Sequence, residues 1–329
     1  MKTYDVVGIG NAVVDVISPA PDLFLDQMGI TKGIMQLVER ERAEVLYGAM
    51  EKRTETPGGS VANTLAGLGS LGLMTAFVGR VADDALGKFY ADQMNEGGTD
   101  FVNPPVAGAE LPTSRSMIFV SPDGERSMNT YLGVSSELSE ADVDATVMTS
   151  AKMLFLEGYL FDKDKGKAAF LRAAADCHQG GGKSGISLSD PFCVDRHRDD
   201  FRTLVRDEMD YVIGNEDEWK SLYQVTDLDE ALKLASADCA MIVCTRSGDG
   251  VSIVRGTEHV HVPVTPITPV DATGAGDQFA AGFLYGLATG RGIETCGRMG
   301  CVAAGEVISH IGPRPETDMK AMFEAEGLV

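Results

Sequence analysis

One short segment, D-A-T-G-A-G-D at residues 271–277, holds the residue types that phosphate chemistry needs. Apolar residues recur at helical spacing from Phe279 onward, which predicts a helix that begins near Gly276. The first turn of a helix has free backbone N–H groups and the positive end of the helix dipole, and glycines let these amides approach an anion closely. Such a cradle suits the charge that spreads over phosphoryl oxygens during transfer. Asp277 lies in this turn, as a helix-terminal partner or as a base aimed at a hydroxyl, and the motif alone leaves both possibilities open.

Similar polar residues occur at other places where a predicted strand ends or a predicted helix begins. The segment 58–63, G-G-S-V-A-N, places two glycines before a second helix. Asn11 and Asp15 follow the first strand, and Asn215 and Glu218 follow a later strand at a spacing of one helical turn. Each could be structural, because Asn and Asp are common helix caps. Ligands of open α/β sheets bind at the carboxyl edge of the strands, so the shared placement predicts one site.

The segments that must position these residues alternate between strand and helix from about residue 152. This order predicts an α/β fold, a three-layer α/β/α domain with a mostly parallel central sheet. Residues 250–264 then predict a hairpin with R-G-T-E as its turn. Two closing helices are expected, one over 275–288 and one from 293 to the stop signal Gly312-Pro313.

The N-terminal third is predicted to contain a helix over 60–72 and several short strands. The strands fall within about 12–18, 31–38 and 100–132, and the last interval holds two of them joined by the turn S-P-D-G. We expect no crossover helices between parallel partners here, so the strands should form a small sheet separate from the main one. We interpret it as a lid on a single domain that spans residues 1–329, whose closure would exclude water as a competing acceptor.

Composition excludes several classes of function. The chain has 49 acidic and 28 basic residues, and the net charge of −21 disfavours nucleic acid and anionic membranes as partners. No apolar run approaches the ~20 residues of a membrane helix, and the first residues do not read as a secretory signal, so we expect a cytoplasmic protein. The six cysteines form no C-x-x-C pair, which favours reduced thiols over a zinc site.

Two glycine patterns that could suggest other chemistry are in the wrong context. Residues 67–72 match G-x-G-x-x-G, but they are predicted to end a helix, whereas the dinucleotide fingerprint follows a strand and opens a helix. Gly182-Lys183-Ser184 resembles the end of a P-loop, but a strand follows it rather than precedes it. A nicotinamide-dependent oxidoreductase is therefore disfavoured.

Taken together, the surviving motifs resemble the ribokinase-like (PfkB) family of small-molecule kinases over nearly the whole chain. Four motifs stand in the order of that family: G-G-S-V-A-N at 58–63, N-E-D-E at 215–218, C-T-R-S-G-D-G at 244–250 and D-A-T-G-A-G-D at 271–277. The third, which matches the nucleotide loop, departs from the family because Ser247 stands where glycine is common.

Three further segments, 10–15, 125–128 and 188–192, resemble adenosine kinases within this family. Thr273 is a departure, because eukaryotic adenosine kinases usually carry asparagine there and sugar kinases of the family often have threonine. The resemblance is closest to bacterial adenosine kinases, and sugar kinases remain the alternative.

The resemblance implies a division of roles. The γ-phosphate of ATP would lie over an anion hole of Gly274, Ala275 and Gly276, and Asp277 would accept the proton of the attacking primary hydroxyl. Asp15 would accept hydrogen bonds from vicinal ribose hydroxyls. The remaining acceptor-site residues would be Asn11, Gly58, Gly59, Ser60 and Asn63.

The resemblance also implies cations. Asn215 and Glu218 would position Mg²⁺ through water and phosphate oxygens, since magnesium usually keeps several waters. Asp271 and the Thr273 carbonyl lie where many relatives bind a monovalent cation, which makes K⁺ a candidate. The nucleotide-binding residues would be Asn215, Glu218, Thr245, Gly248 and Gly250.

Three residues carry two interpretations each. Arg126, on the outgoing strand of the S-P-D-G hairpin, would reach the phosphates or would be a solvated surface arginine. Leu37 and Phe192 would be walls for a base or ordinary core residues.

The favoured hypothesis is an ATP- and Mg²⁺-dependent kinase that phosphorylates the 5′-hydroxyl of adenosine, giving AMP and ADP. The alternative is a sugar kinase of the same family that acts on ribose, fructose or a similar sugar. A non-catalytic nucleoside-binding module is less favoured, because Asp277 and the N-x-x-E pair are retained. We expect no nucleic-acid or membrane partner, and either a monomer or a homodimer formed through the lid.

Overall fold

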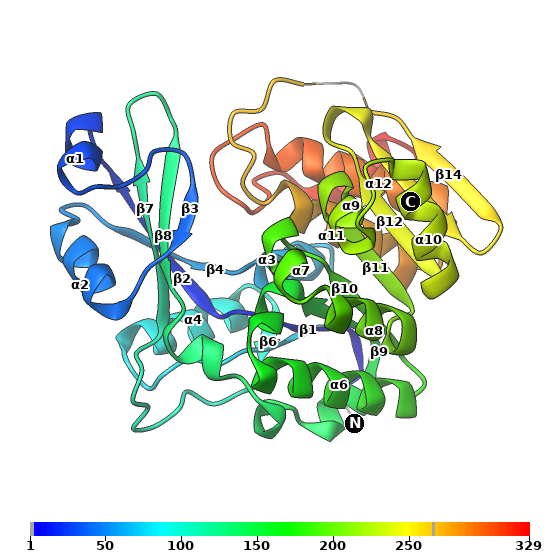
Figure 1. Cartoon of the computed structure of the whole chain (residues 1–329), viewed down its shortest axis with the longest axis horizontal. Coiled ribbons are helices and arrows are strands. Elements are labelled where there is room, and N and C mark those ends of the chain that lie inside the picture. Colours follow the sequence, from blue (N-terminus) through cyan, green and yellow to red (C-terminus); the bar gives the residue numbers. More distant parts are fainter. Residues whose placement is uncertain (1–2, 265–266) are drawn as a thin grey trace.

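The computed structural model describes residues 3–264 and 267–329, and its largest element is a nine-stranded sheet (Figure 1). In spatial order its strands are β14 (Glu258–Val262), β13 (Val251–Arg255), β12 (Met241–Thr245), β11 (Tyr211–Asn215), β10 (Lys183–Ser187), β9 (Ala151–Glu157), β1 (Tyr4–Ile9), β5 (Thr75–Val78) and β6 (Thr99–Phe101). The strands from β12 to β6 pair in parallel, and only the β13–β14 hairpin adds antiparallel pairs. The predicted α/β fold with a mostly parallel sheet is confirmed.

Helices cover both faces of this sheet. In chain order, the helices of the protein are α1 (Asp22–Gln27), α2 (Arg40–Ala49), α3 (Ser60–Ser70), α4 (Ala85–Glu96), α5 (Ala145–Thr149), α6 (Asp164–Gln179), α7 (Pro191–Arg196), α8 (Arg198–Glu208), α9 (Glu216–Tyr223), α10 (Leu228–Asp238), α11 (Ala275–Ala288), α12 (Ile293–Val307) and α13 (Met319–Ala325). Of these, α1 and α2 lie against a second, smaller sheet and not against this one (Figure 1). Short 3₁₀ turns are η1 (Gly133–Glu137), η2 (Glu140–Asp142), η3 (Gly158–Asp162) and η4 (Ser247–Asp249).

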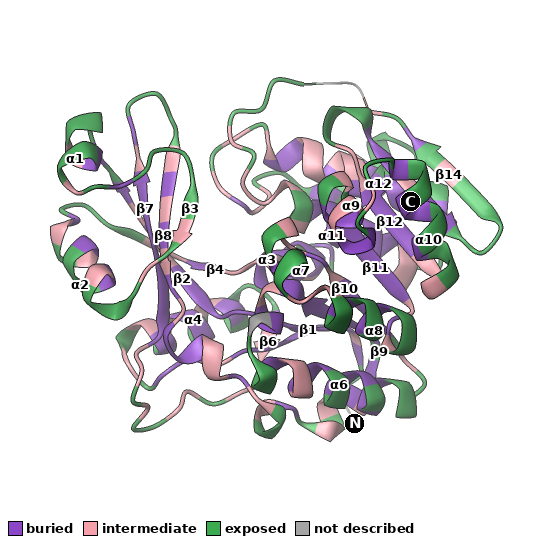
Figure 2. Cartoon of the chain, viewed as in Figure 1, coloured by how far each residue is buried: buried purple, intermediate pink, exposed green. Residues whose placement is uncertain are grey.

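The strands of the large sheet are largely buried (Figure 2). Successive residues of each buried strand point to opposite faces, so the sheet divides the core in two. On β1, Val6 packs with α3, α11 and α12, whereas Val7 packs with the helices from α5 to α10. Phe155 and Leu154 of β9 divide in the same way. Because every inner strand is covered on both faces, its carboxyl end is the part that can present polar side chains to a ligand.

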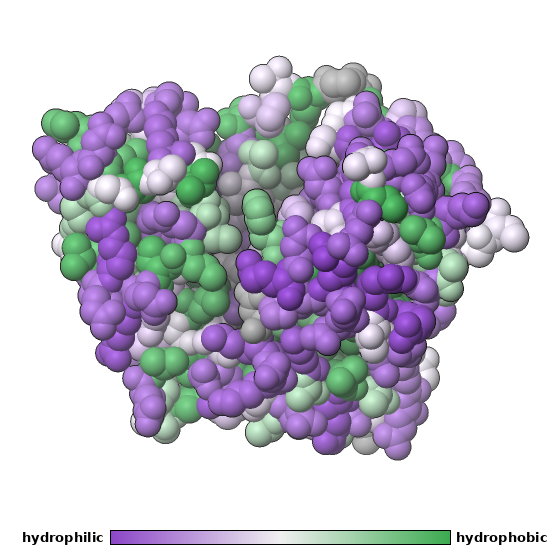
Figure 3. Space-filling model, in the orientation of Figure 1, coloured by the Kyte–Doolittle hydropathy of each residue, from purple (hydrophilic) through white to green (hydrophobic). Residues whose placement is uncertain are grey.

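A second sheet of five strands lies beside the large one, with α1 and α2 on its outer side (Figure 1). Its order is β3 (Met35–Leu37), β8 (Arg126–Tyr131), β7 (Ser114–Val120), β2 (Val13–Pro19) and β4 (Thr54–Gly58). The surface is hollowed between the two parts (Figure 3). The small sheet shares the core cluster that contains α3, because Val14 and Phe119 belong to it.

Four details of the chain differ from the expectation. Two pairs of the small sheet, β2–β7 and β3–β8, are parallel and have helices between their strands, so the expectation of no crossovers there was wrong. Strand β4 was not predicted, and Thr99–Phe101 pairs with β5 in the large sheet. Helix α12 ends at Val307, before Gly312-Pro313, because the Glu306 carboxylate accepts hydrogen bonds from the following loop and the chain turns back.

The two glycine patterns at 67–72 and 182–184 have the structural context that was predicted for them. Residues 67–72 end α3 and lead into β5, and Gly182 and Lys183 join α6 to β10. The six cysteines are free thiols. None of the helices in the described ranges has the length and apolar character that crossing a membrane requires.

Candidate active site

Asp277 lies in the first turn of α11, and two side chains of α3 hold its carboxylate. Ser60 Oγ donates to Oδ1 at 2.6 Å, and Asn63 Nδ2 donates to Oδ2 at 3.0 Å. Burial raises the pKa of Asp277 to about 6, although the hydrogen bonds from Ser60 and Asn63 and the charge of Arg314 act to lower it. The group is therefore ionised at neutral pH, held in one orientation, and able to accept a proton.

The backbone before Asp277 forms the cradle that its glycines predicted. Gly274 has φ +81° and precedes α11, and a Cβ there would lie 2.5 Å from Cα of Pro313, so only glycine fits. Gly276 is exposed, and nothing lies within 4 Å of the position that its Cβ would take. The Ala275 N–H donates to the Ala272 carbonyl oxygen at 3.3 Å, whereas the N–H groups of Gly276 and Asp277 have no intrahelical partner, so an anion can approach these two from the open side.

Asn11 lies at the carboxyl end of β1, and its side chain is fixed at both ends. Its Nδ2 donates to Glu157 Oε1 at 2.7 Å, and its Oδ1 accepts from Ser135 Oγ at 2.7 Å. The residue is 4% exposed. Gly59, with φ +101°, packs directly against it, because a Cβ on Gly59 would lie 2.2 Å from the Asn11 carbonyl oxygen.

Glu157 is a site residue that sequence reasoning missed. It ends β9, is 1% exposed, and also accepts from the backbone N–H groups of Asn11 and of Val61 in α3, at 3.2 and 3.3 Å. Burial raises its pKa to about 7. The available signal was a glutamate at the end of the apolar run L-F-L-E, where a buried strand would otherwise continue.

Asp15 lies on β2, over the backbone of Gly58. A Cβ on Gly58 would come within 2.5 Å of the Asp15 carboxyl group, so glycine is required for this approach. Burial raises the pKa of Asp15 to about 6, the charges of Arg126 and Arg314 act to lower it, and Asp277 acts to raise it. The two carboxylates therefore belong to one electrostatic site.

Arg126 is buried, so the interpretation of it as a solvated surface arginine was wrong. Its Nη1 forms an ion pair with Asp271 Oδ2 at 2.7 Å, and the side chains are only 7% and 9% exposed. Asp271 also accepts from the N–H groups of Thr273 at 2.9 Å and Gly312 at 3.0 Å. Burial acts to raise the pKa of Asp271, but these hydrogen bonds and Arg126 hold it below its usual value.

This ion pair bears on the proposed monovalent-cation site. The guanidinium of Arg126 already neutralises the Asp271 carboxylate, so a K⁺ ion there would have to compete with it. Across residues 3–264 and 267–329, no three or more His, Cys, Asp and Glu side chains gather in a way that could hold a metal ion.

Asn215 and Glu218 form a capping box at the start of α9. Asn215 Oδ1 accepts from the Glu218 N–H at 2.9 Å, and the Glu218 carboxylate accepts from the Asn215 N–H and Nδ2, both at 2.8 Å. Glu218 is 5% exposed, and burial raises its pKa to about 7. Because both side chains are engaged with each other, they fit an indirect contact to Mg²⁺ through water better than a direct one.

The predicted nucleotide loop leaves the same edge of the sheet, because Thr245 of β12 pairs in register with Asn215 of β11. Ser247 has φ +48°, which explains why glycine is common at this position in the family. Gly250 has φ +88°, and a Cβ there would lie 2.0 Å from the Val262 carbonyl oxygen. Gly248 faces open space.

A cavity of about 580 Å³ extends from Asn11 along the small sheet. Leu37, Tyr131, Leu132 and Tyr159 are among the residues that line it. Leu37 is 56% exposed and lines this cavity, so its interpretation as an ordinary core residue was wrong. Phe192 is 72% exposed at the start of α7, and it neither lines this cavity nor belongs to the core.

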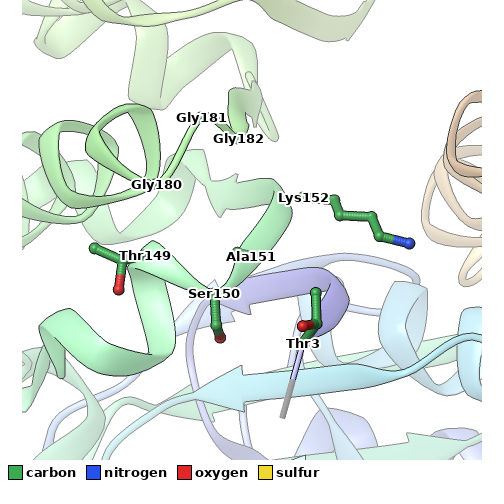
Figure 4. A pocket seen from close by; sticks show the side chains of 8 residues that line it. All are labelled: Thr3, Thr149, Ser150, Ala151, Lys152, Gly180, Gly181 and Gly182. Carbon is green, nitrogen blue, oxygen red and sulfur yellow. The ribbon is translucent and has the colours of Figure 1, made fainter. Parts of the chain in front are cut away.

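A second cavity, of about 350 Å³, lies at the other end of the large sheet, where β9 begins (Figure 4). Its lining includes Thr149, Ser150, Lys152 and the glycines 180–182. The Thr149 and Ser150 hydroxyls bond to their own helix turn, and Lys152 points away from the glycines and pairs with Asp5. This cavity contains none of the predicted site residues.

Comparison with known proteins identifies the family. The pfkB family carbohydrate kinase profile matches residues 27–319. The chain belongs to the pfkB family. It is therefore a kinase, a phosphotransferase that acts on a sugar or nucleoside with ATP, and kinases of this family typically use Mg²⁺.

Solved structures from two bacteria are similar over almost the entire pfkB chain. A probable sugar kinase from Rhizobium etli CFN 42 is 46% identical, with a TM-score of 0.91 and full coverage of both chains. An adenosine kinase from Sinorhizobium meliloti is 45% identical, with a TM-score of 0.90, covering 98% of this chain and 100% of that one. A curated 5-dehydro-2-deoxygluconokinase from Bacillus velezensis is 28% identical over 318 residues, covering 94% of this chain and 89% of the relative.

Proposed function

We propose that this pfkB kinase transfers the γ-phosphoryl group of ATP to the 5′-hydroxyl of adenosine, giving AMP and ADP. The observation that carries the proposal is the cavity of about 580 Å³ that begins at Asn11. Ligand pockets of ~300–1,000 Å³ are usual for drug-sized molecules, so this cavity has room for a nucleoside. Leu37 and Tyr131 on the small sheet, and Tyr159 opposite, offer apolar and aromatic surface to a purine beside the sugar site.

In this proposal the acceptor's ribose lies between Asp15 and Asp277. Asp15 accepts hydrogen bonds from the vicinal ribose hydroxyls, and Asn11 and Ser60 complete the sugar site. Asp277 takes the proton of the 5′-hydroxyl as the oxygen attacks phosphorus, and its pKa of about 6 keeps it ionised at neutral pH. The orientation imposed by Ser60 and Asn63 supports this role, because positioning dominates phosphoryl transfer.

The amides around Gly274, Ala275 and Gly276 stabilise the charge on the transferred group. Asn215 and Glu218 would hold Mg²⁺ through water, and the ion would neutralise part of the charge on the phosphates. We also propose that the small sheet is a lid that excludes water from the acceptor. The ion pair between Arg126 on β8 and Asp271 before the cradle supports this role, since it links the small sheet to the phosphate side.

A sugar kinase is the second candidate, and Thr273 together with the sugar-kinase relatives favours it. Steady-state phosphorylation of adenosine, inosine, ribose and fructose at equal enzyme concentration separates the two. We expect adenosine to have the highest kcat/KM. A kcat/KM for ribose or fructose well above that for adenosine would reject the adenosine proposal and leave the kinase intact.

A mutation in the cavity wall sharpens this test. Leu37→Asp places a charge against the proposed purine, so it should raise the KM for adenosine without lowering activity on a simple sugar. Leu23→Asp, at another exposed apolar residue that does not line the cavity, is the matched control. An equal effect of both substitutions would argue against a purine in this cavity.

A further inference from the structure

Arg314 lies in the loop between α12 and α13, and its side chain reaches into the site. Its Nε donates to Asn63 Oδ1 at 3.3 Å, and its Nη2 donates to the Pro57 carbonyl oxygen at 2.9 Å. Pro57 precedes the glycine over which the Asp15 carboxyl lies. The guanidinium thus joins the end of β4 to the start of α3, the two elements that frame the acceptor side.

The hydrogen bond from Arg314 fixes which way the Asn63 amide faces. Arginine can only donate, so the oxygen of the amide must face Arg314. The NH₂ end then faces Asp277 and donates to Oδ2 at 3.0 Å. Asn63 is 5% exposed, so water cannot easily replace either partner. If the amide turned over, its oxygen would face the carboxylate and repel it.

Arg314 also supplies charge to both carboxylates. Its cation attracts Asp15 and Asp277, which repel each other. The other titratable or charged groups that act on these two are Arg126 of β8, Glu157 of β9 and two tyrosines, Tyr90 of α4 and Tyr159 of η3. Arg126 is already paired with a third carboxylate. Within the described ranges no ion pair engages Arg314, and its charge acts on Tyr90, Asp15 and Asp277.

We propose that Arg314 is a positioning residue for phosphoryl transfer, which orients the Asn63 hydrogen bond to Asp277 and lets Asp15 and Asp277 remain ionised together. The inference rests on the proposed function in one respect, that Asp277 is the base. The charge relation itself does not depend on which acceptor is used.

The first test is the pH dependence of kcat/KM for Arg314→Gln and Arg314→Lys. R314Q keeps a donor for Asn63 but loses the charge, so the acid limb, which reports the base, should move to higher pH by roughly one unit, as expected for loss of a nearby opposite charge. R314K keeps the charge and should retain the wild-type acid limb. Arg80→Gln, which breaks an ion pair with Asp142, is the matched control and should leave the limb unchanged. An unmoved acid limb in R314Q, or an equal shift in R314K, would overturn the proposal.

The second test needs no acceptor. Removing the cation raises the folded-state pKa values of Asp15 and Asp277, so the loss of stability in R314Q should be larger at pH 8, where both are ionised, than at pH 5. Unfolding is followed by the fluorescence of Trp219, the only tryptophan in the sequence. A loss of melting temperature that is equal at the two pH values indicates a merely structural role and contradicts the charge relation. If R314Q does not fold, Arg314→Met replaces it.

The two tests separate the inference from the proposed function. A pH-dependent loss of stability in a protein that phosphorylates no nucleoside would reject the adenosine proposal while the charge relation stands. If the protein phosphorylates adenosine and the acid limb of kcat/KM is the same in R314Q as in the wild type, only the inference about Arg314 is rejected.

Discussion

The buried carboxylate of Glu157 gives the clearest quantitative prediction. It is 1% exposed and accepts three hydrogen bonds, from the N–H and Nδ2 of Asn11 and the N–H of Val61. These bonds connect β9 to the end of β1 and to the start of α3. We consider Glu157→Gln, which preserves the shape of the side chain, removes the charge, and turns an NH₂ group toward at least one backbone donor.

The sign of the effect follows from the pKa. Burial raises the pKa of Glu157 from 4.5 to about 7 in the folded state, so the folded protein binds this proton more tightly than the unfolded chain. Stability from this group is therefore greatest below pH 4.5 and is lost as the pH rises to about 7. At about 1.4 kcal/mol per pKa unit, the wild type loses on the order of 3 kcal/mol across this interval.

E157Q has no proton to lose, so this loss should disappear. At pH 5 the variant should be less stable than the wild type by ~1–3 kcal/mol, the cost of a buried donor left unsatisfied. By pH 8 the difference should shrink toward zero, because the wild type now carries the buried charge. The assay is chemical denaturation of both proteins at several pH values, with the free energy of unfolding compared pairwise so that other carboxylates cancel.

Glu306→Gln is a control for which we expect the opposite dependence of the stability loss on pH. Glu306 is also buried, but hydrogen bonds from Thr317, Glu316 and His310 hold its pKa below the usual value despite burial. Its contribution to stability is present at neutral pH and lost on acidification, so E306Q should cost more at pH 8 than at low pH. If E157Q and E306Q showed the same pH trend, or if the deficit of E157Q grew from pH 5 to pH 8, the reasoning from burial would be refuted.

Two further predictions concern the phosphate side of the site. Gly274→Ala should lower both the melting temperature and kcat, because the φ of +81° and the contact with Pro313 exclude a Cβ. Gly276→Ala has room in the fold and should lower only kcat, by crowding the phosphoryl group. An equal loss of melting temperature in the two variants would contradict this. Asn215→Ala removes a helix cap worth ~1 kcal/mol. Both this variant and Glu218→Gln should raise the Mg²⁺ concentration needed for half-maximal rate. If titrations of rate against Mg²⁺ coincide with that of the wild type, these two residues have no role in holding magnesium.

Much of the fold could be predicted because the signals are local. The apolar periodicity of α3 and α11 and the turn at 255–258 are each set by a few neighbouring residues, and the structure has them close to the predicted bounds. The small sheet was only partly predicted. Strand β4, T-E-T-P-G, has no apolar alternation, and it is extended because it pairs with β2.

The residues that sequence reasoning missed depend on contacts between distant parts of the chain. Glu157 meets Val61 across 96 residues, and Arg314 meets Asn63 across 251. Neither residue belongs to one of the four family motifs, and the glutamate at the end of the run L-F-L-E does not by itself indicate which residues it contacts. Arg126 shows the same limit: its position in the hairpin was predicted, but its partner Asp271 lies 145 residues away.

The central claim, that Asp277 is the base of an adenosine kinase, is tested most directly by one product assay. Wild type and Asp277→Asn are incubated with adenosine and Mg²⁺–ATP, and AMP formation is followed by chromatography while adenosine binding is measured in parallel. We predict AMP from the wild type and a rate lower by ~10² or more in D277N, the usual scale for a general base, with binding largely retained. Full activity in D277N, or no AMP from a wild type that binds adenosine, would contradict the account.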